Sequence, residues 1–290
     1  MAKNWNGFRS RTIVPLAMLL AIALAGCTGS RSSGPSAKVD IDPSTASQVN
    51  ISSLNAVVSQ NPSDASAYNV RGTAYGKAGK LNEALADFDK AIELNPAFYQ
   101  AYANRALVHR RKNNDDLALA DYNRAIEINP NYDAAYVGRG NIYRQRKQLD
   151  PALADFNRAI ELDTADPRAY HNRGLVYQAL GQHSQAIQDF TTAISRAPTA
   201  LEPYNGRGLS YLATADYKAA LDDFNEVVKR DRDSYEGWTN QGLALEKLGE
   251  HQKAFAAFAR ASNLNPSYRP AKDGMRRNNA SAKGSTVSQG

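Results

Sequence analysis

The chain has 290 residues, of which 42% are hydrophobic and 22% are charged, a composition typical of folded globular proteins rather than disordered ones. Its formal net charge is +6, but residues 65–266 contain 25 basic and 25 acidic residues, so the excess lies near the two ends. A body that binds nucleic acid would carry a basic surplus of its own. The charge distribution therefore argues against nucleic acid as a partner.

The first 26 residues have the layout of an export signal. Lys3, Arg9 and Arg11 precede an apolar run over residues 13–25 that ends in small residues. A helix of this length rises only about 20 Å, less than the ~30 Å hydrocarbon core of a bilayer, so a permanent transmembrane span is the weaker alternative. We therefore predict a signal peptide over residues 1–26.

The signal peptide is followed by a cysteine in a motif that resembles the lipobox of bacterial lipoproteins, Leu24-Ala25-Gly26-Cys27. The resemblance, over residues 24–27, implies that Cys27 is acylated, with chains such as palmitate, and becomes the mature N-terminus. An ordinary signal peptide is the alternative, but Cys27 is the only cysteine, and an unpaired thiol is a liability in an oxidising compartment. Lipidation predicts permanent membrane anchoring. Thr28 implies, by the sorting rule of enterobacterial lipoproteins, the periplasmic face of the outer membrane.

Two short segments join this anchor to the body of the chain. Residues 27–42 are mostly small and polar, without apolar periodicity, and are predicted to be a flexible tether. Residues 43–62 are predicted to be a helical half-repeat that caps the N-terminal end of the body. The apolar side of this helix is expected to consist of Val49, Leu54 and Val57.

Prolines recur along the body at a spacing of 34 residues. They occupy positions 62, 96, 130, 198 and 266, and Thr164 and Arg232 stand at the two vacant points of the series. A period of 34 is typical of units that contain two antiparallel helices. The predicted units follow one another without an insertion, over residues 65–98, 99–132, 133–166, 167–200, 201–234 and 235–268.

The other recurring positions, counted from the first residue of each unit, resemble those of the tetratricopeptide repeat family. Position 8 is small, position 20 is alanine and position 24 is aromatic in every unit, and position 4 is Tyr68, Tyr102, Tyr136, Tyr170, Tyr204 and Trp238. The resemblance covers residues 65–268. It implies an all-α fold, a right-handed α-solenoid of six helical hairpins with capping helices, in which stacking buries the apolar stripe that one hairpin leaves open.

Two further elements complete the predicted body. In the third unit, Asp150 and Pro151 are expected to supply the N-cap and a first-turn proline of the second helix. Residues 269–290 are predicted to be a C-terminal capping helix and a tail. The polar and basic stretch up to Asn279 is expected to form the helix, and the residues from Ser281 onward are expected to be disordered.

A basic and an acidic position recur together. Position 7 is arginine and position 23 is aspartate in five units, whereas the sixth unit has Gln241 and Ala257. Because both charges vanish together, we predict charge-assisted hydrogen bonds between them, within a unit or across to the next. A row of arginines facing a ligand is the alternative, but it gives no reason for the loss of the aspartate. The predicted structural pairs are Arg71 with Asp87, Arg105 with Asp121, Arg139 with Asp155, Arg173 with Asp189, and Arg207 with Asp223.

In tetratricopeptide repeat proteins the first helices line a concave groove that binds proteins or peptides, and the resemblance implies the same here. The groove positions are basic or carry amides in the first three units, whereas Glu202, Glu236, Glu246, Leu209, Leu212 and Leu243 stand in the last two. An acidic peptide, a chain carboxylate or a phosphorylated glycan is therefore expected in the N-terminal half. The alternative is that these residues are merely solvated. The candidate partner-binding residues are Lys77, Asn104, Arg110, Arg111, Asn141, Arg144 and Asn172.

One known activity of the family is not transferred to this chain. The branch that binds chaperone C-termini uses a clamp of lysines, asparagines and an arginine. Only Asn141 and Asn172 match two successive positions of that clamp. Its cationic positions are occupied here by Val137, Glu202 and Gly206.

The sequence contains no recognised arrangement of catalytic or metal-binding residues. The four histidines, His109, His171, His183 and His251, have no partner histidine at a spacing of three or four and no cysteine to complete a zinc site. A Gly-Lys-Thr phosphate loop and a Gly-x-Ser-x-Gly elbow are also absent from the sequence. We therefore predict no enzymatic activity, no cofactor and no metal. His109 replaces the usual tyrosine at position 11 and is expected to be a packed core residue.

The predicted combination of a lipid anchor and six repeats resembles NlpI-type envelope lipoproteins, which act as adaptors that gather peptidoglycan hydrolases and proteases at the outer membrane. The resemblance implies a non-catalytic adaptor in envelope maintenance or division. Two alternatives share the architecture: pilotin lipoproteins, which escort the secretin of type IV pili, and lipoproteins that help to insert outer-membrane barrels. A third alternative is a binder of glycans or lipopolysaccharide through the basic half of the groove. The oligomeric state stays open.

Overall fold

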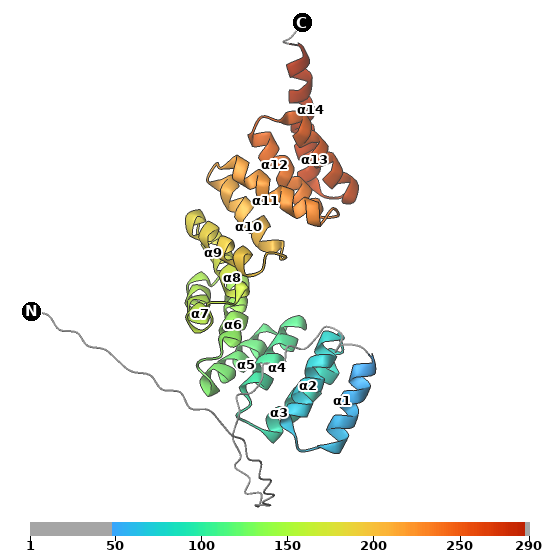
Figure 1. Ribbon diagram of the computed structural model, residues 1–290, viewed down its shortest axis with the longest axis vertical. Helices are drawn as coiled ribbons and strands as arrows, with labels where there is room; N and C mark the ends of the chain where they lie inside the picture. Colours follow the sequence, from blue (N-terminus) through green and yellow to red (C-terminus); the bar gives the residue numbers. More distant parts are fainter. Residues whose placement is uncertain (1–47, 288–290) are drawn as a thin grey trace, which may run out of the picture. The chain divides into compact units, whose positions relative to one another are not determined.

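The computed structural model of the protein describes residues 48–287, with side chains from 51 to 279. The predicted signal peptide, Cys27 and the predicted tether lie outside the described residues. The part of the chain that is described contains fourteen α-helices and no strands (Figure 1). None of the helices from Gln48 to Val287 combines the length and the apolar character that crossing a bilayer requires.

Twelve of these helices form six antiparallel hairpins, and the second helix of each hairpin packs against the first helix of the next (Figure 1). The first helices are α2 (Ala65–Lys77), α4 (Tyr99–Arg111), α6 (Asp133–Gln145), α8 (Pro167–Ala179), α10 (Glu202–Ala213) and α12 (Tyr235–Lys247). The second helices are α3 (Leu81–Leu94), α5 (Asp115–Ile128), α7 (Leu149–Leu162), α9 (His183–Arg196), α11 (Tyr217–Arg230) and α13 (His251–Leu264). This stack of hairpins confirms the prediction of an all-α solenoid.

The two helices of each hairpin lie on different sides of the stack. The first helices of consecutive hairpins contact one another, whereas successive second helices make no such contact within the described residues. The stack is therefore shorter along its first helices than along its second helices. We call the surface formed by the first helices the inner face and the surface formed by the second helices the outer face.

In the core of a hairpin, an aromatic ring from the second helix packs against the small residue at position 8 of the first helix. Phe156 on α7 is fully buried, and a Cβ added to Gly140 on α6 would lie 2.9 Å from its ring. Repeat two has Ala106 at the glycine position. Its aromatic residue, Tyr122, lies against Gly138 of the next hairpin, where an added Cβ would lie 2.3 Å from the ring. Small residues therefore set how closely the helices approach.

The turn inside every hairpin places the residue at position 15 in a left-handed backbone conformation. Glycine adopts this conformation without steric cost, whereas other residues pay about 1 kcal/mol. The residue is glycine in repeats one, four and six and a residue with a side chain in the other three: Gly79, Gly181 and Gly249 against Asn113, Lys147 and Ala215.

Helix α1 (Gln48–Gln60) covers the N-terminal hairpin and packs against α2. It buries Ile51 and Val58, whereas Val57 is 43% exposed. The prediction that Val57 lies on the apolar side is therefore wrong. Ile51 and Val58 stand two helical turns apart and share a face with the half-buried Leu54, which leaves Val57 beside that face. The side chain of Val49 lies outside the described residues.

Helix α14 (Arg269–Val287) covers the other end and packs against α12 and α13. It is helical beyond Ser281, in a stretch for which the sequence suggests disorder. The expected N-cap at Asp150 is also wrong. Because α7 begins at Leu149 after an N-cap at Gln148, Asp150 lies inside the first turn.

Candidate functional site

The five predicted charge pairs are in contact, each between the two helices of one hairpin. Arg139 on α6 donates two hydrogen bonds to the two carboxylate oxygens of Asp155 on α7, at 2.9 and 2.7 Å. Asp155 is only 5% exposed, and burial raises its pKa while the hydrogen bonds from Arg139 oppose the shift. The same bidentate contact joins Arg71 to Asp87, Arg105 to Asp121, Arg173 to Asp189 and Arg207 to Asp223.

Each of these arginines also binds the preceding repeat, a contact that the sequence analysis missed. The Nη1 atom of Arg139 donates to Oδ1 of Asn123 on α5 at 2.7 Å. The other acceptors occupy the equivalent position 25 and are Asn55, Asp89, Asn157 and Thr191. The sequence does contain a signal for this contact, because a polar side chain recurs at position 25. Because one guanidinium joins three helices, the row of arginines is part of the framework of the protein.

Repeat six has an opening where the charge pair is missing. Gln241 donates a hydrogen bond to Asn225 at 2.7 Å, and Ala257 replaces the aspartate. A hollow of about 610 Å³ lies there, lined by Leu221, Trp238, Leu245 and Ala257 among others. The shorter side chains at positions 7 and 23 leave this space.

A row of leucines at position 9 follows the inner face. Leu107 and Leu209 are 42% and 37% exposed, and Leu175 and Leu243 are half-buried. We call these four residues the leucine row. Side chains of this kind on neighbouring helices form a surface to which the apolar side chains of a partner can bind.

Several of the predicted partner-binding residues form hydrogen bonds within the protein itself. Asn104 donates to an asparagine of α2 at 3.0 Å, and Arg111 donates to a backbone carbonyl of α2 at 2.7 Å. Asn141 and Asn172 each donate to a carbonyl of their own helix. Lys77 is exposed at the end of α2. Asn104 and Arg111 therefore join two repeats.

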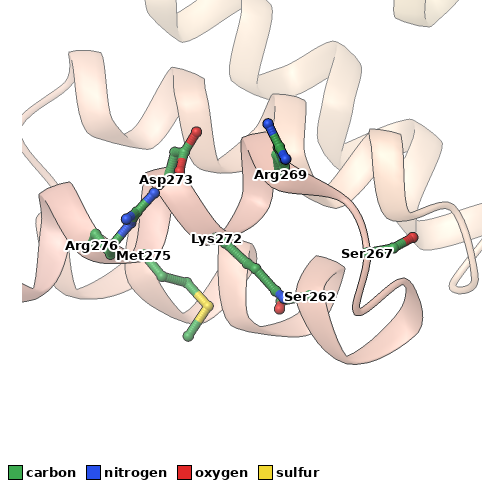
Figure 2. A pocket seen from close by; sticks show the side chains of 7 residues that line it. All are labelled: Ser262, Ser267, Arg269, Lys272, Asp273, Met275 and Arg276. Atoms are coloured by element: carbon green, nitrogen blue, oxygen red, sulfur yellow. Dashed lines mark hydrogen bonds and ion pairs between the residues drawn. The ribbon is translucent and has the colours of Figure 1, made fainter.

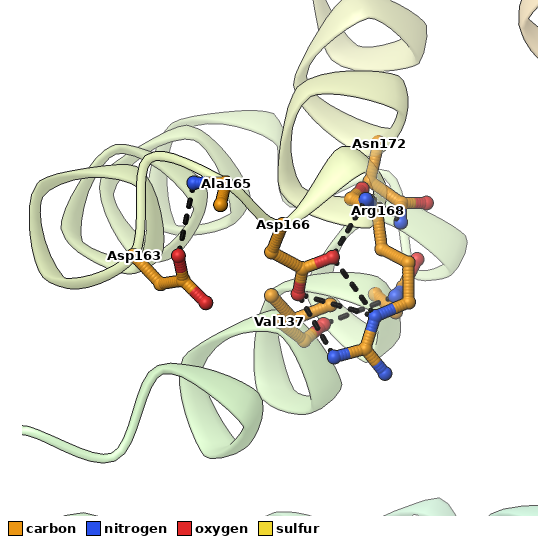
Figure 3. Close-up of polar contacts among 7 residues, drawn as sticks. Val137, Asp163, Ala165, Asp166, Arg168 and Asn172 are labelled. Atoms are coloured by element: carbon orange, nitrogen blue, oxygen red, sulfur yellow. Dashed lines mark hydrogen bonds and ion pairs between the residues drawn. The ribbon is translucent and has the colours of Figure 1, made fainter. Parts of the chain in front are cut away.

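The start of α8 shows how a cation beside the inner face is neutralised (Figure 3). Asp166 accepts a hydrogen bond from the backbone N–H of Arg168 at 2.8 Å and caps the helix. The same carboxylate binds the Arg168 guanidinium, with Nη2 2.8 Å from Oδ2. This hydrogen bond raises the pKa of Arg168. Arg168 thus has its own counterion.

Arg110 and Arg144 have no carboxylate partner within residues 51–279. They occupy position 12 of α4 and α6, two first helices in contact with each other. The Nη2 atom of Arg144 lies 3.4 Å from Oδ1 of Asn141, and its Nε is buried without a hydrogen-bond partner. Burial lowers the pKa of Arg144, and the charge of Arg110 lowers it further. Arg110 has a hydrogen bond with the hydroxyl of Tyr122. Neither cation has a carboxylate counterion within these residues.

The acidic character expected of the C-terminal half is weaker than the sequence suggests. Arg277 on α14 donates to both carboxylate oxygens of Glu246, at 2.7 and 2.8 Å. This contact lowers the pKa of Glu246. Glu202 and Glu236 are exposed. The capping helix therefore supplies a counterion that the repeat pattern does not contain.

A further hollow, of about 760 Å³, lies where the chain passes from α13 to α14 (Figure 2). Its lining includes the basic residues Arg269, Lys272 and Arg276, and Arg276 pairs with Asp273. None of these charged side chains is buried. The hollow is a surface depression rather than an enclosed binding site.

The four histidines lie in separate environments. Within residues 51–279, no three His, Cys, Asp or Glu side chains come together as metal ligands. Burial lowers the pKa of His109 and of His171, and the Nδ1 atom of each is buried without a partner. His251 shares a hydrogen bond of 2.8 Å with Asn278 of α14, and Nδ1 of His183 is buried. These contacts are those of packed side chains.

Comparison with known families gives one consistent result. The family model of the tetratricopeptide repeat matches residues 65–98, 99–132 and 167–199. Two related models, described as TPR repeat and tetratricopeptide repeat, match residues 140–181 and 205–268. Together the matches cover more than half of the chain. A comparison with curated proteins by sequence returns no match.

Solved structures with a similar fold include proteins of very different context. The APC/C hetero-tetramer Cut9-Hcn1 gives a TM-score of 0.70 at 19% identity over 83% of this chain, which spans 49% of that one. YrrB, a TPR protein with an unusual peptide-binding site, gives 0.56 at 24% identity, covering 65% of this chain and 97% of that one. PilW, a type IV pilus biogenesis factor, gives 0.66 at 16% identity, covering 72% and 97%. At these identities the likeness shows the fold alone.

Proposed function

Because the chain belongs to the tetratricopeptide repeat family, we propose that it is a non-catalytic adaptor whose inner face binds a segment of a partner protein. The leucine row carries this proposal, since Leu175, Leu209 and Leu243 lie on three consecutive first helices, α8, α10 and α12, that contact one another in the stack. The outer face is less suited to this role, because the one large hydrophobic residue that the second helices expose within residues 51–279, Leu117 on α5, stands alone.

The adaptor is further proposed to be exported and anchored through lipidated Cys27 to the periplasmic face of the outer membrane. The lipobox over residues 24–27 supports this part of the proposal, as does the absence of any second cysteine. In this location it would gather peptidoglycan hydrolases or proteases during envelope maintenance or division.

Photocrosslinking in cells tests the use of the inner face. A photoreactive residue at Leu209 on α10 is expected to capture envelope hydrolases or proteases, identified by mass spectrometry. The matched control carries the same residue at the exposed Lys229 of α11, in the same repeat but on the outer face. Equal capture from both positions, or capture from Lys229 alone, would contradict the proposal.

The anchor is tested separately by fractionation. Cys27→Ser is expected to move the protein from the membrane fraction to a soluble one, because the acyl chains that hold it cannot be attached. A wild-type protein found in the cytosol with residues 1–26 intact would contradict export and anchoring together.

Assembly of a type IV pilus is the second candidate function. One observation favours it: the repeats of this chain cover 97% of PilW, a type IV pilus biogenesis factor. Capture of a secretin from Leu209 would select this role. Capture of barrel-assembly proteins, or of cell-wall fragments alone, would select one of the other two alternatives.

A further inference from the structure

Eight arginines are half-buried among residues 51–279, and six of them form an ion pair with a carboxylate. The two exceptions, Arg110 and Arg144, stand at the same position of neighbouring first helices on the inner face. A partly desolvated cation without a counterion is costly in the free protein, and a bound anion would remove that cost.

We propose that Arg110 and Arg144 form a subsite that binds a carboxylate of an acidic segment of the partner protein. This inference rests on the proposed function and names the chemistry of its ligand. The planar guanidinium presents parallel donors that match a carboxylate. The terminal nitrogens of Arg144 carry uncommitted donors, because only the 3.4 Å contact of Nη2 with Asn141 occupies them.

The other cations near this surface are already engaged. Arg111 donates to the backbone carbonyl of Gly76 at 2.7 Å, and Arg168 is neutralised by Asp166. The arginines of the charge pairs are each bound to a buried aspartate. The subsite is therefore narrower than the basic half that the sequence suggests, and it centres on two side chains.

The apolar surroundings favour a peptide over a phosphorylated glycan. Leu107 precedes Arg110 by three residues, so the two side chains are neighbours on α4. Leu107 is 42% exposed. Leu175 lies on α8, the next first helix after that of Arg144. A peptide with apolar side chains beside its acidic residue would cover the leucines and neutralise the arginines, whereas a phosphorylated sugar would leave the leucines uncovered.

The test presents the full-length protein in detergent with a pool of random hexapeptides with blocked termini and sequences the bound fraction. The wild type is expected to enrich Asp and Glu over Asn and Gln by about tenfold, the ratio that a difference of about 1.4 kcal/mol produces. Arg110→Gln/Arg144→Gln is expected to abolish this enrichment. The matched control, Arg124→Gln/Arg158→Gln, removes the same charge from α5 and α7, the second helices of the same repeats.

One further variant and one further measurement keep the result interpretable. Arg144→Lys keeps the charge but lacks the planar donors, so its enrichment is expected to lie between those of the wild type and the double variant. Urea midpoints close to that of the wild type would show that both double variants are folded.

Each outcome separates the subsite from the wider function. Retained enrichment in Arg110→Gln/Arg144→Gln, or its loss in the control, would overturn the subsite. Hexapeptides bound by the wild type without acidic preference would overturn the subsite and leave the adaptor function intact. If no hexapeptide binds and a phosphorylated disaccharide does, the subsite and the adaptor function both fail.

Discussion

Repeats three and six build the same junction from different side chains. In repeat three, Arg139 holds Asp155 of its own hairpin and Asn123 of the preceding one. In repeat six, Gln241 holds only the preceding hairpin, and a hollow of about 610 Å³ remains beside it. The comparison shows that the charge pair both fills space and joins hairpins. The contact to the preceding repeat is the part that persists when the charges are lost.

The largest effect is expected from breaking the pair in repeat three. Asp155→Ala leaves Arg139 half-buried without its counterion, so the free energy of unfolding should fall by about 3–5 kcal/mol. Gln241→Ala, at the junction that already lacks the pair, should cost less than about 1.5 kcal/mol, the value of one ordinary hydrogen bond. Urea denaturation measures both.

The double variant Arg139→Gln/Asp155→Ala sharpens the comparison, because it copies repeat six into repeat three. It should regain most of the stability that Asp155→Ala loses, since no uncompensated charge remains. A cycle in which the effects of the two substitutions simply add would refute the coupling between Arg139 and Asp155.

The next largest effect concerns packing. Gly138→Ala places a Cβ 2.3 Å from the buried ring of Tyr122 and should lower the free energy of unfolding by about 1–3 kcal/mol. The control is Gly76→Ala, whose Cβ would meet Val108 at an ordinary 3.7 Å. The control should be neutral or stabilising, since alanine favours the helix. Equal losses from both variants, measured by urea denaturation, would exclude close packing as the cause.

A smaller effect separates the turns of repeats five and six. Ala215→Gly relieves a left-handed backbone and should stabilise the protein by about 1 kcal/mol, whereas Gly249→Ala imposes the same strain and should destabilise it by a similar amount. Thermal unfolding should show midpoints that move in opposite directions. If both midpoints moved in the same direction, the left-handed backbone at position 15 would not be the cause of the shifts.

The smallest effect is on the pH dependence of stability. It concerns position 11, which is His109 in repeat two and Tyr143 in repeat three. Burial lowers the pKa of His109, although Asp121 opposes the shift. The unfolded chain therefore binds more protons, and stability is lost as the pH falls below about 6.5. His109→Tyr should reduce the loss between pH 7 and pH 5 by less than about 1 kcal/mol. An unchanged pH profile of the urea midpoint in His109→Tyr would show that His109 does not contribute to this loss of stability.

The periodic features of the molecule are the ones that the sequence predicts well. The 34-residue spacing contains enough information for the all-α solenoid, and the joint loss of charge in repeat six points to a contact that the structure contains. Features that depend on single contacts between distant residues are not periodic. The pairing of Glu246 with Arg277 is one, and the hydrogen bond between His251 and Asn278 is another.

The buried face of α1 was predicted wrongly for a related reason. Val57 and Val58 are adjacent, and only the packing against α2 decides which of them is buried. The sequence does not reveal that Arg110 and Arg144 lack a carboxylate partner either, because this depends on where every nearby carboxylate lies in the folded protein.

The missing pair in repeat six also gives the protein a mechanical weak point. A pull on its two ends would load every junction between hairpins in series, and the one between α11 and α12 has the neutral Gln241 at position 7, where the others have a guanidinium. The last hairpin would detach first under tension. Arg110 and Arg144 lie in the hairpins that stay folded, so a bound partner would remain attached while the chain lengthens at its C-terminal end.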